Sequence, residues 1–309
     1  MKNHKKIVIG ILDQGVWFDN YEGELKDAFD EYYGKFEMEN LDFADQGTRH
    51  ENVPAGDHGF YVLDRLLQVC GNYDIIKVIN GKVFSSWRSD PMALIRGLKY
   101  MADNEVDLLN LSLGIPKAIR VNRRYLTDIN CELDRIVNKG GLTLISAGNE
   151  GEVFRNGFCF DNANWLAEDP DNNLSVGSHD RNGRWDKFSS SGGSVDVSAI
   201  GSDLCLMGRN SLATVSGTSF SCPSMTGFCA NVLIDQLTKL KTGEKTVKEL
   251  VFEHMSEAIK PKYKMKFLGN KNPWFGYGSF ESYIKYFLRY YKRDVLQHAL
   301  FYDTNIRNM

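Results

Sequence analysis

The sequence predicts an α/β protein in which a mostly parallel sheet of about seven strands lies between two layers of helices. Short apolar runs alternate with segments of helical spacing along most of the chain, which is the pattern of a parallel sheet covered on both faces. No Pro-, Gly- or Ser-rich linker divides the 309 residues. We therefore expect one domain over residues 1–309, with its core at about residues 6–290 and a short C-terminal tail.

The apolar runs are short and bounded by polar or glycine residues, which favours buried strands over helices. The first covers residues 6–12 and ends directly at Asp13. The later runs lie at residues 75–79, 106–111, 142–146, 174–176 and 195–199.

The helical segments are recognised by apolar residues three and four positions apart and by their terminal signals. Asp90 with Pro91 marks the start of one helix, and Gly140-Gly141 marks the end of another. We expect helices at residues 60–70, 90–104, 126–138, 218–240 and 246–258, and a last one through Tyr283, Phe287, Tyr291 and Val295.

Composition narrows the class of protein. Hydrophobic residues make up 42%, charged residues 25%, and the net charge is -3, so nothing indicates a nucleic-acid or membrane partner. The apolar run after the basic N-terminus is too short for a secretory signal, which predicts a cytoplasmic protein. The six cysteines have no Cys-x-x-Cys spacing and are expected to be free thiols, several of them buried.

Three reactive side chains fall at strand ends or helix starts, where parallel α/β sheets place their ligands. Asp13 follows the first strand, His58 opens a helix, and Ser219 stands at the start of the long apolar helix. A serine hydroxyl becomes a nucleophile when an imidazole takes its proton, and a carboxylate holds that imidazole in the required tautomer. Each residue alone is more often a turn or a helix cap, but the three together predict a catalytic triad.

A fourth segment, residues 146–151 (SAGNEG), comes directly after a predicted strand. Its small residues, Ala147 and Gly148, let a substrate approach the backbone. Asn149 offers an amide donor that, with the backbone N–H of Ser219, can stabilise the oxyanion of a tetrahedral intermediate. Glu150 allows two interpretations: a solvated loop carboxylate, or a group that attracts a basic substrate side chain.

These segments resemble the motifs of the subtilisin-like serine peptidases, in the family's order. Residues 8–15 (VIGILDQG) resemble the aspartate motif, 57–59 (DHG) the histidine motif, and 216–219 (SGTS) with Pro223 the serine motif. Asn149 matches the family's oxyanion asparagine, and residues 107–114 (DLLNLSLG) resemble the segment that pairs with substrate. Supporting motifs are similar at residues 176–178, 188–190 and 275–278.

The resemblance implies a serine endopeptidase that acts through an acyl-enzyme, with Asp13, His58 and Ser219 as triad. It also implies that an extended peptide adds as a β-strand to the backbone of Ser112, Leu113 and Gly114. The chain departs from the family at Gln14, where Thr or Ser is common, at Phe220, where Met is usual, and over residues 152–171. These departures bear on the shape of the pocket.

Other functions remain open at this stage. Few residues precede the first strand, so no inhibitory pro-domain fits there, and a regulatory protein partner or an occluding loop at residues 152–171 would have to restrain activity. The chain is then a partner-gated peptidase, a dedicated processing peptidase, or a silent scaffold that acts by binding. We expect a peptide or protein substrate and no cofactor; structural calcium is conceivable, but no calcium loop is evident. Cys222, one helical turn after Ser219, is either a core residue or a thiol near the site.

Overall fold

The computed structural model describes residues 6–18, 27, 36–71, 73–85, 88–116, 122–151, 153–155, 158–167, 173–209 and 212–258. The expected last helix through Tyr283 and Val295, and the motif at residues 275–278, lie outside the described residues.

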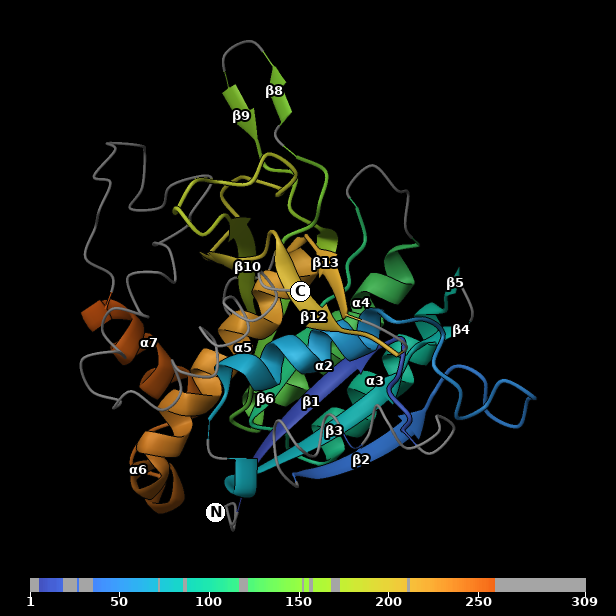
Figure 1. Ribbon diagram of the computed structural model, residues 1–309. Coiled ribbons are helices and arrows are strands. Elements are labelled where there is room, and N and C mark those ends of the chain that lie inside the picture. The colour runs from blue at the N-terminus through green and yellow to red at the C-terminus, as the bar shows by residue number, and fades with distance from the viewer. Residues whose placement is uncertain are drawn as a thin grey trace.

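The central sheet has seven strands, all parallel, in the order β11-β10-β7-β6-β1-β3-β2 (Figure 1). The predicted fold class is therefore confirmed. The first strand of the sequence, β1, lies inside the sheet, between β6 and β3. The bounds are β1 Ile7–Asp13, β2 Glu37–Asp42, β3 Ile76–Lys82, β6 Leu108–Leu111, β7 Leu142–Ser146, β10 Asn173–His179 and β11 Val197–Ile200.

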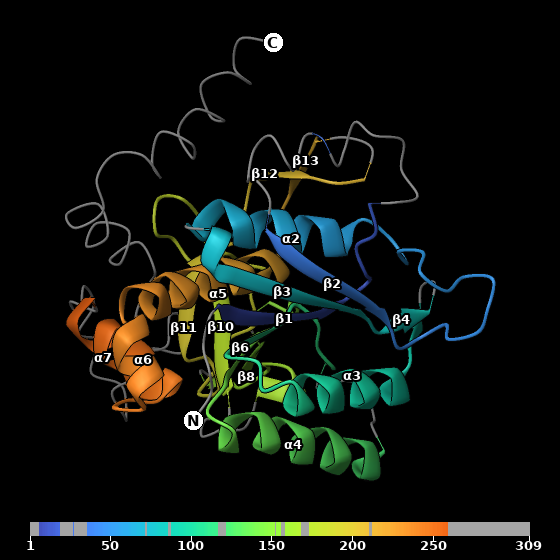
Figure 2. The ribbon, with the colours of Figure 1, turned by 90° about the horizontal axis from the view of Figure 1, so that it is seen from below.

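Helices cover both faces of the sheet, as Figure 2 shows. One face carries α2 (His58–Val69) and α5 (Thr218–Asp235), with α6 (Leu237–Thr242) and α7 (Val247–Ala258) beyond them; the other carries α3 (Pro91–Asp103) and α4 (Arg123–Asn138). Asp90 caps α3 by accepting a hydrogen bond from the N–H of Met92, as its sequence predicts. Among the described helices, none has the length and apolar character needed to cross a membrane.

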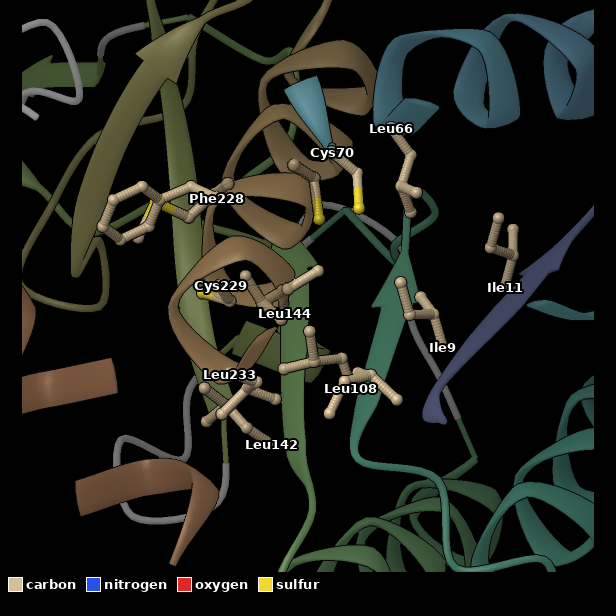
Figure 3. Close-up of a cluster of buried hydrophobic side chains, with 14 of the residues drawn as sticks. Ile9, Ile11, Leu66, Cys70, Leu108, Leu142, Leu144, Phe228, Cys229 and Leu233 are labelled. Atoms are coloured by element: carbon tan, nitrogen blue, oxygen red, sulfur yellow. The ribbon is translucent and has the colours of Figure 1, made fainter. Parts of the chain in front are cut away.

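The alternation of side chains along β1 explains how one strand serves two cores. Ile7, Ile9 and Ile11 enter the cluster under α2 and α5, while Leu12 enters the cluster under α3 and α4. Figure 3 shows the first cluster, in which Ile9 and Ile11 lie with side chains of the neighbouring strands and of α2 and α5. Gly10 faces α3, where a Cβ atom would come within 2.8 Å of the Met101 sulfur. The small residue lets helix and sheet pack closely.

Several element boundaries differ from the sequence prediction. The helix expected over residues 218–240 is divided at Gln236 into α5 and α6, because a turn there lets the later helices fold back onto the core. The helix expected from residue 126 begins at Arg123, with Asn122 as its cap. The edge strand β2 was not predicted, because its sequence EMENLD is acidic and an edge strand needs less apolar surface.

Three small hairpins stand outside the sheet and were also not predicted. They are β4–β5 (Phe84–Ser85, Arg88–Ser89), β8–β9 (Val153–Arg155, Phe158–Phe160) and β12–β13 (Leu204–Met207, Leu212–Val215). In Figure 1 the β8–β9 hairpin projects away from the body of the sheet. Two 3₁₀ turns, Tyr73–Ile75 and Trp165–Ala167, complete the described elements.

A buried ion cluster holds the loop between β2 and α2. The ammonium of Lys82, 1% exposed, lies 3.1 Å from Asp42 Oδ2 and 2.6 Å from Asp45 Oδ2, and it also donates to the carbonyl of His50. Asp42 in turn accepts N–H groups of its own loop. Because Lys82 is also the β3 partner of Asp13, the cluster joins this loop to the end of β1.

Replacing Lys82 with Met is expected to lower the free energy of unfolding by about 3–5 kcal/mol, because two buried carboxylates lose their counter-charge. Urea unfolding followed by circular dichroism measures the change. Lys77→Met, on the same strand, is the matched control. Among the described residues, Lys77 pairs with Glu37, which is exposed, and Glu39, which is partly exposed. Lys77→Met should cost less than about 1 kcal/mol. Equal losses in the two variants would contradict this account of the cluster.

Candidate active site

The predicted site residues gather along one edge of the sheet. Because β1, β6 and β7 are parallel, their carboxyl ends lie at the same edge. Asp13 is the last residue of β1, Ser112 directly follows β6, and Ala147 directly follows β7. The starts of α2 and α5 bring His58 and Ser219 to this edge.

Asp13 and His58 form a close hydrogen-bonded pair. The ring Nδ1 of His58 lies 2.8 Å from Asp13 Oδ1 and 3.1 Å from Oδ2, and the Asp13 carboxylate is fully buried. Glycines permit this approach: a Cβ on Gly59 would lie 2.8 Å from the carbonyl oxygen of Gly15, which itself has a φ of 87°. The backbone of the turn after β1 and that of the first turn of α2 therefore approach closely at these two glycines.

The environment of His58 favours its charged form. Burial acts to lower the pKa of His58, but the charge of Asp13 and its hydrogen bond outweigh burial, and the pKa is raised above its ordinary value. The His58 side chain is 30% exposed, so the ring still reaches the solvent side of the edge. Since Nδ1 is committed to Asp13, Nε2 is the ring atom available for proton transfer.

Ser219 is positioned by the first turn of α5 and by Pro223. A proline has no N–H, so Pro223 cannot form the helical bond to the carbonyl oxygen of Ser219, four residues earlier. That carbonyl instead accepts a hydrogen bond of 2.7 Å from the Ser112 hydroxyl. The Ser219 hydroxyl donates to the Ser112 carbonyl at 3.3 Å, so two bonds join this turn to the end of β6.

Ser219 and His58 lie on neighbouring turns but are not hydrogen-bonded. Among the contacts of the described residues, the Ser219 hydroxyl bonds to Ser112 and not to the imidazole. The His58 ring packs against Phe220, the residue after Ser219, with ring centroids 5.5 Å apart. Phe220 also meets Tyr61 of α2 edge-on. The phenylalanine that departs from the family pattern therefore forms a wall beside the imidazole.

Asn149 is tied to the start of α5. Its Oδ1 accepts hydrogen bonds of 2.9 Å from both the backbone N–H and the hydroxyl of Thr218. Because Oδ1 accepts from Thr218, the amide NH₂ is the end left to donate. A Cβ on Gly217 would lie 3.6 Å from that Nδ2 atom, and the Asn149 residue is exposed. The donor therefore lies beside the turn that carries Ser219 and is open to solvent.

The two predicted substrate segments are joined by a residue that the sequence analysis did not identify. Asn164, only 1% exposed, donates from Nδ2 to the carbonyl of Ser146 and from its backbone N–H to that of Ala147. A Cβ on Gly114 would lie 2.5 Å from Asn164 Nδ2. Asn164 therefore sets the spacing between the segments after β6 and β7. Its only sequence signal was the turn-forming run DNAN at residues 161–164.

Two alternatives from the sequence can be compared with the structure. Cys222 is fully buried, its thiol is 3.9 Å from the carbonyl of Leu111, and burial raises the pKa of the thiol, all of which favour the core interpretation. The Glu150 carboxylate accepts a hydrogen bond of 2.8 Å from the Ser190 hydroxyl, so it is held against the segment at Gly148. Among the cysteines whose side chains the structure describes, Cys70, Cys131, Cys222 and Cys229 are free thiols, as expected.

Metal ligands do not gather at the site. In the described part of the chain, no three His, Cys, Asp or Glu side chains form a group able to hold an ion.

A parallel sheet with an Asp–His pair and a helix-initiating serine along one edge is the architecture of an α/β serine peptidase. Residues 4–278 match the Subtilase family, and the chain belongs to this family. It is 25% identical to Subtilisin DY of Bacillus licheniformis over 229 residues, which cover 74% of this chain and 76% of that protein. In seven further curated relatives the matched segments cover 29–51% of the protein.

Solved structures share the fold at lower identity. The prenylagaramide maturation protease PagA has a TM-score of 0.64 and 19% identity, with 91% of this chain and 93% of that chain covered. The epidermin leader peptide processing serine protease EpiP of Staphylococcus aureus has a TM-score of 0.70 and 17% identity, with 94% and 77% covered. At these identities the likeness concerns the fold alone.

Proposed function

We propose that the chain hydrolyses peptide bonds with Ser219 as nucleophile, His58 as general base and then general acid, and Asp13 as the group that orients His58. The observation that carries the proposal is the bond of 2.8 Å between buried Asp13 and Nδ1 of His58. This bond directs the lone pair of Nε2 outward, where it can take the proton of a serine hydroxyl. An acyl-enzyme forms on Ser219, and water then releases the second product.

The reaction requires the Ser219 hydroxyl to leave the Ser112 carbonyl and turn toward His58. The Ser219 hydroxyl bonds to the Ser112 carbonyl, and rotation about the Cα–Cβ bond redirects it toward the imidazole. Catalytic hydrogen bonds are often long or misaligned without substrate and tighten in the complex. A peptide strand paired with Ser112, Leu113 and Gly114 competes for the same backbone groups. Substrate binding is thus expected to favour the reactive orientation of the hydroxyl.

Asn149 and the backbone N–H of Ser219 are proposed to hold the oxyanion of the tetrahedral intermediate. Asn149→Ala should lower kcat by about 10²–10³-fold with little change in KM, because the donor acts mainly in the transition state. Steady-state kinetics on one peptide substrate gives both constants. A fall of less than about threefold in kcat would remove Asn149 from this role.

The proposal is tested by comparing wild-type protein with Ser219→Ala. Mass-spectrometric profiling of a peptide library detects cleavage and reads its specificity, and a fluorophosphonate probe reports nucleophilic reactivity at the serine. Circular dichroism verifies that both proteins are folded. If folded wild type neither cleaves the library nor reacts with the probe, the active-peptidase proposal fails and a binding role of the scaffold is favoured.

A narrower candidate is a processing peptidase that cleaves one precursor peptide or protein. The likeness to PagA and EpiP favours it, since one is named as a maturation protease and the other as a leader peptide processing protease. Library profiling distinguishes the two: a processing peptidase cleaves few sequences at related sites, whereas a broad endopeptidase cleaves many. Activity that appears only with an added partner would indicate gating.

A further inference from the structure

The first turn of α2 is not capped by its own N-cap residue. The first N–H groups of a helix have no partner within the helix and need an outside acceptor. Asp57 stands at the N-cap position but makes no side-chain cap bond. Its carboxylate instead accepts a hydrogen bond of 2.6 Å from Nε of Arg209, beyond β12. The N–H of His58, the first residue of α2, likewise needs an acceptor from outside the helix.

Gln14 supplies that acceptor. Its side-chain Oε1 lies 3.2 Å from the backbone nitrogen of His58, which donates to it. The backbone N–H of Gln14 donates to Asp13 Oδ1 at 2.7 Å, and its carbonyl accepts from the N–H of Ala55 at 2.8 Å. One residue thus contacts the carboxylate, the backbone of the histidine and the loop that leads to it.

Gly56 provides independent evidence for the same contact. A Cβ at this position would overlap Gln14 Oε1 and lie 3.1 Å from its Cδ. Gly56 is not among the glycines with a positive φ, so its backbone conformation alone does not require glycine. The side chain of Gln14 is therefore what makes a larger residue at position 56 unfavourable.

We propose that Gln14 is a positioning residue that sets the distance between Asp13 and His58 by capping α2 from the end of β1. This inference rests on the proposed function, because it concerns the base of that reaction. Gln14 is proposed to act on His58 and not on substrate. Its amide fixes the first turn of α2, and the turn carries the imidazole.

The first test compares two substitutions of similar length. Gln14→Met removes the acceptor and is expected to lower kcat by about 10–100-fold at unchanged KM, because a small displacement of a catalytic group is costly. Gln14→Glu keeps an oxygen acceptor and should retain kcat within about threefold near pH 8, where the carboxylate is ionised. Gln14→Glu also places a new carboxylate beside Asp13, which further favours the charged form of His58, so kcat of all variants is compared on the pH-independent plateau, where His58 is neutral. If Gln14→Met and Gln14→Glu change kcat equally, or if Gln14→Met leaves kcat unchanged, the proposal is overturned.

The second test is a double-mutant cycle with Gly56. Gly56→Ala should lower kcat in the presence of Gln14, since the new methyl group displaces the amide. In a Gln14→Ala background the same change should have less than about a twofold effect, because nothing remains to be displaced. Additive effects of the two substitutions would show that Gly56 is required for another reason and would contradict the proposal. Thermal unfolding of all four proteins checks that they remain folded.

A third measurement does not depend on peptidase activity. The proton between His58 Nδ1 and Asp13 gives a far-downfield proton NMR signal when the hydrogen bond is short and protected from exchange. The signal should be present in wild type and Gln14→Glu, and broadened or lost in Gln14→Met. If wild type proves inactive, this signal still decides the role of Gln14. An identical signal in all three proteins overturns the positioning role, while absent cleavage by wild type overturns only the proposed function.

Discussion

Ser219→Ala is expected to lower kcat by a factor on the order of 10⁶ and to abolish labelling by a fluorophosphonate probe. Without the hydroxyl no acyl-enzyme can form, and only transition-state stabilisation by the remaining groups accelerates the reaction. Substrate affinity should not fall, because the bond between the Ser219 hydroxyl and the Ser112 carbonyl competes with a paired peptide instead of holding it. Burst kinetics of wild type and variant at equal folded concentration measures the difference.

Ser221→Ala is the matched control for this experiment. Ser221 lies on the same helix, is fully buried, and its hydroxyl donates to the carbonyl of Thr218 at 3.0 Å. Its loss should cost about 1 kcal/mol of stability and leave the probe reaction intact. If Ser219→Ala retains cleavage above one hundredth of the wild-type rate, another residue is the nucleophile and the assignment is wrong.

Asp13→Asn is expected to lower kcat by about 10⁴-fold. The substitution preserves size, but the amide NH₂ can donate to Nδ1 of His58. The ring then carries its proton on Nε2, the atom that must accept the proton of Ser219. Steady-state kinetics at a pH well above the His58 pKa measures this loss without interference from protonation.

The same variant should shift the acid limb of the pH profile. Asp13 raises the pKa of His58, and the imidazole acts as base only when it is neutral, so wild-type kcat/KM should rise with pH above the ordinary histidine range. A neutral asparagine removes the favourable charge, which lowers the His58 pKa and moves the acid limb to lower pH. Asp64 is a buried residue of α2, the helix that carries His58. Asp64→Asn keeps an acceptor for the N–H of Met207 and should leave the acid limb in place. A limb that does not move in Asp13→Asn would contradict the pairing.

The parts of the fold that were predictable have strong local signals. Strands such as Leu142–Ser146 are short runs of buried apolar residues, and helix α3 carries its own cap at Asp90. The edge strand β2 escaped prediction because its acidic sequence gains its conformation from hydrogen bonds to β3, a partner some forty residues away. The break at Gln236 likewise depends on tertiary packing, because it lets apolar residues of α6 and α7 pack against the core.

The residues of the candidate site also fall into two groups, those that a local sequence motif marks and those that only distant contacts reveal. Asp13, His58, Ser219 and Asn149 were recognisable because each stands in a short motif at the end of a strand or the start of a helix. Gln14 and Asn164 were not, because glutamine and asparagine are common on surfaces and in turns. Their contacts cross between segments distant in sequence, from β1 to α2 and from residue 164 to the ends of β6 and β7.

By itself, the sequence determined the class of fold, the order of its main elements and the chemical groups available for reaction. These follow from the spacing of apolar residues and from motifs that a chain carries locally. Only the tertiary structure decided that the imidazole of His58 meets a fully buried carboxylate, that Ser112 holds the turn of Ser219, and that an outside residue caps α2. Such hydrogen bonds tolerate only small changes in the spacing between strands and helices, and that spacing is set by the packing of both cores together.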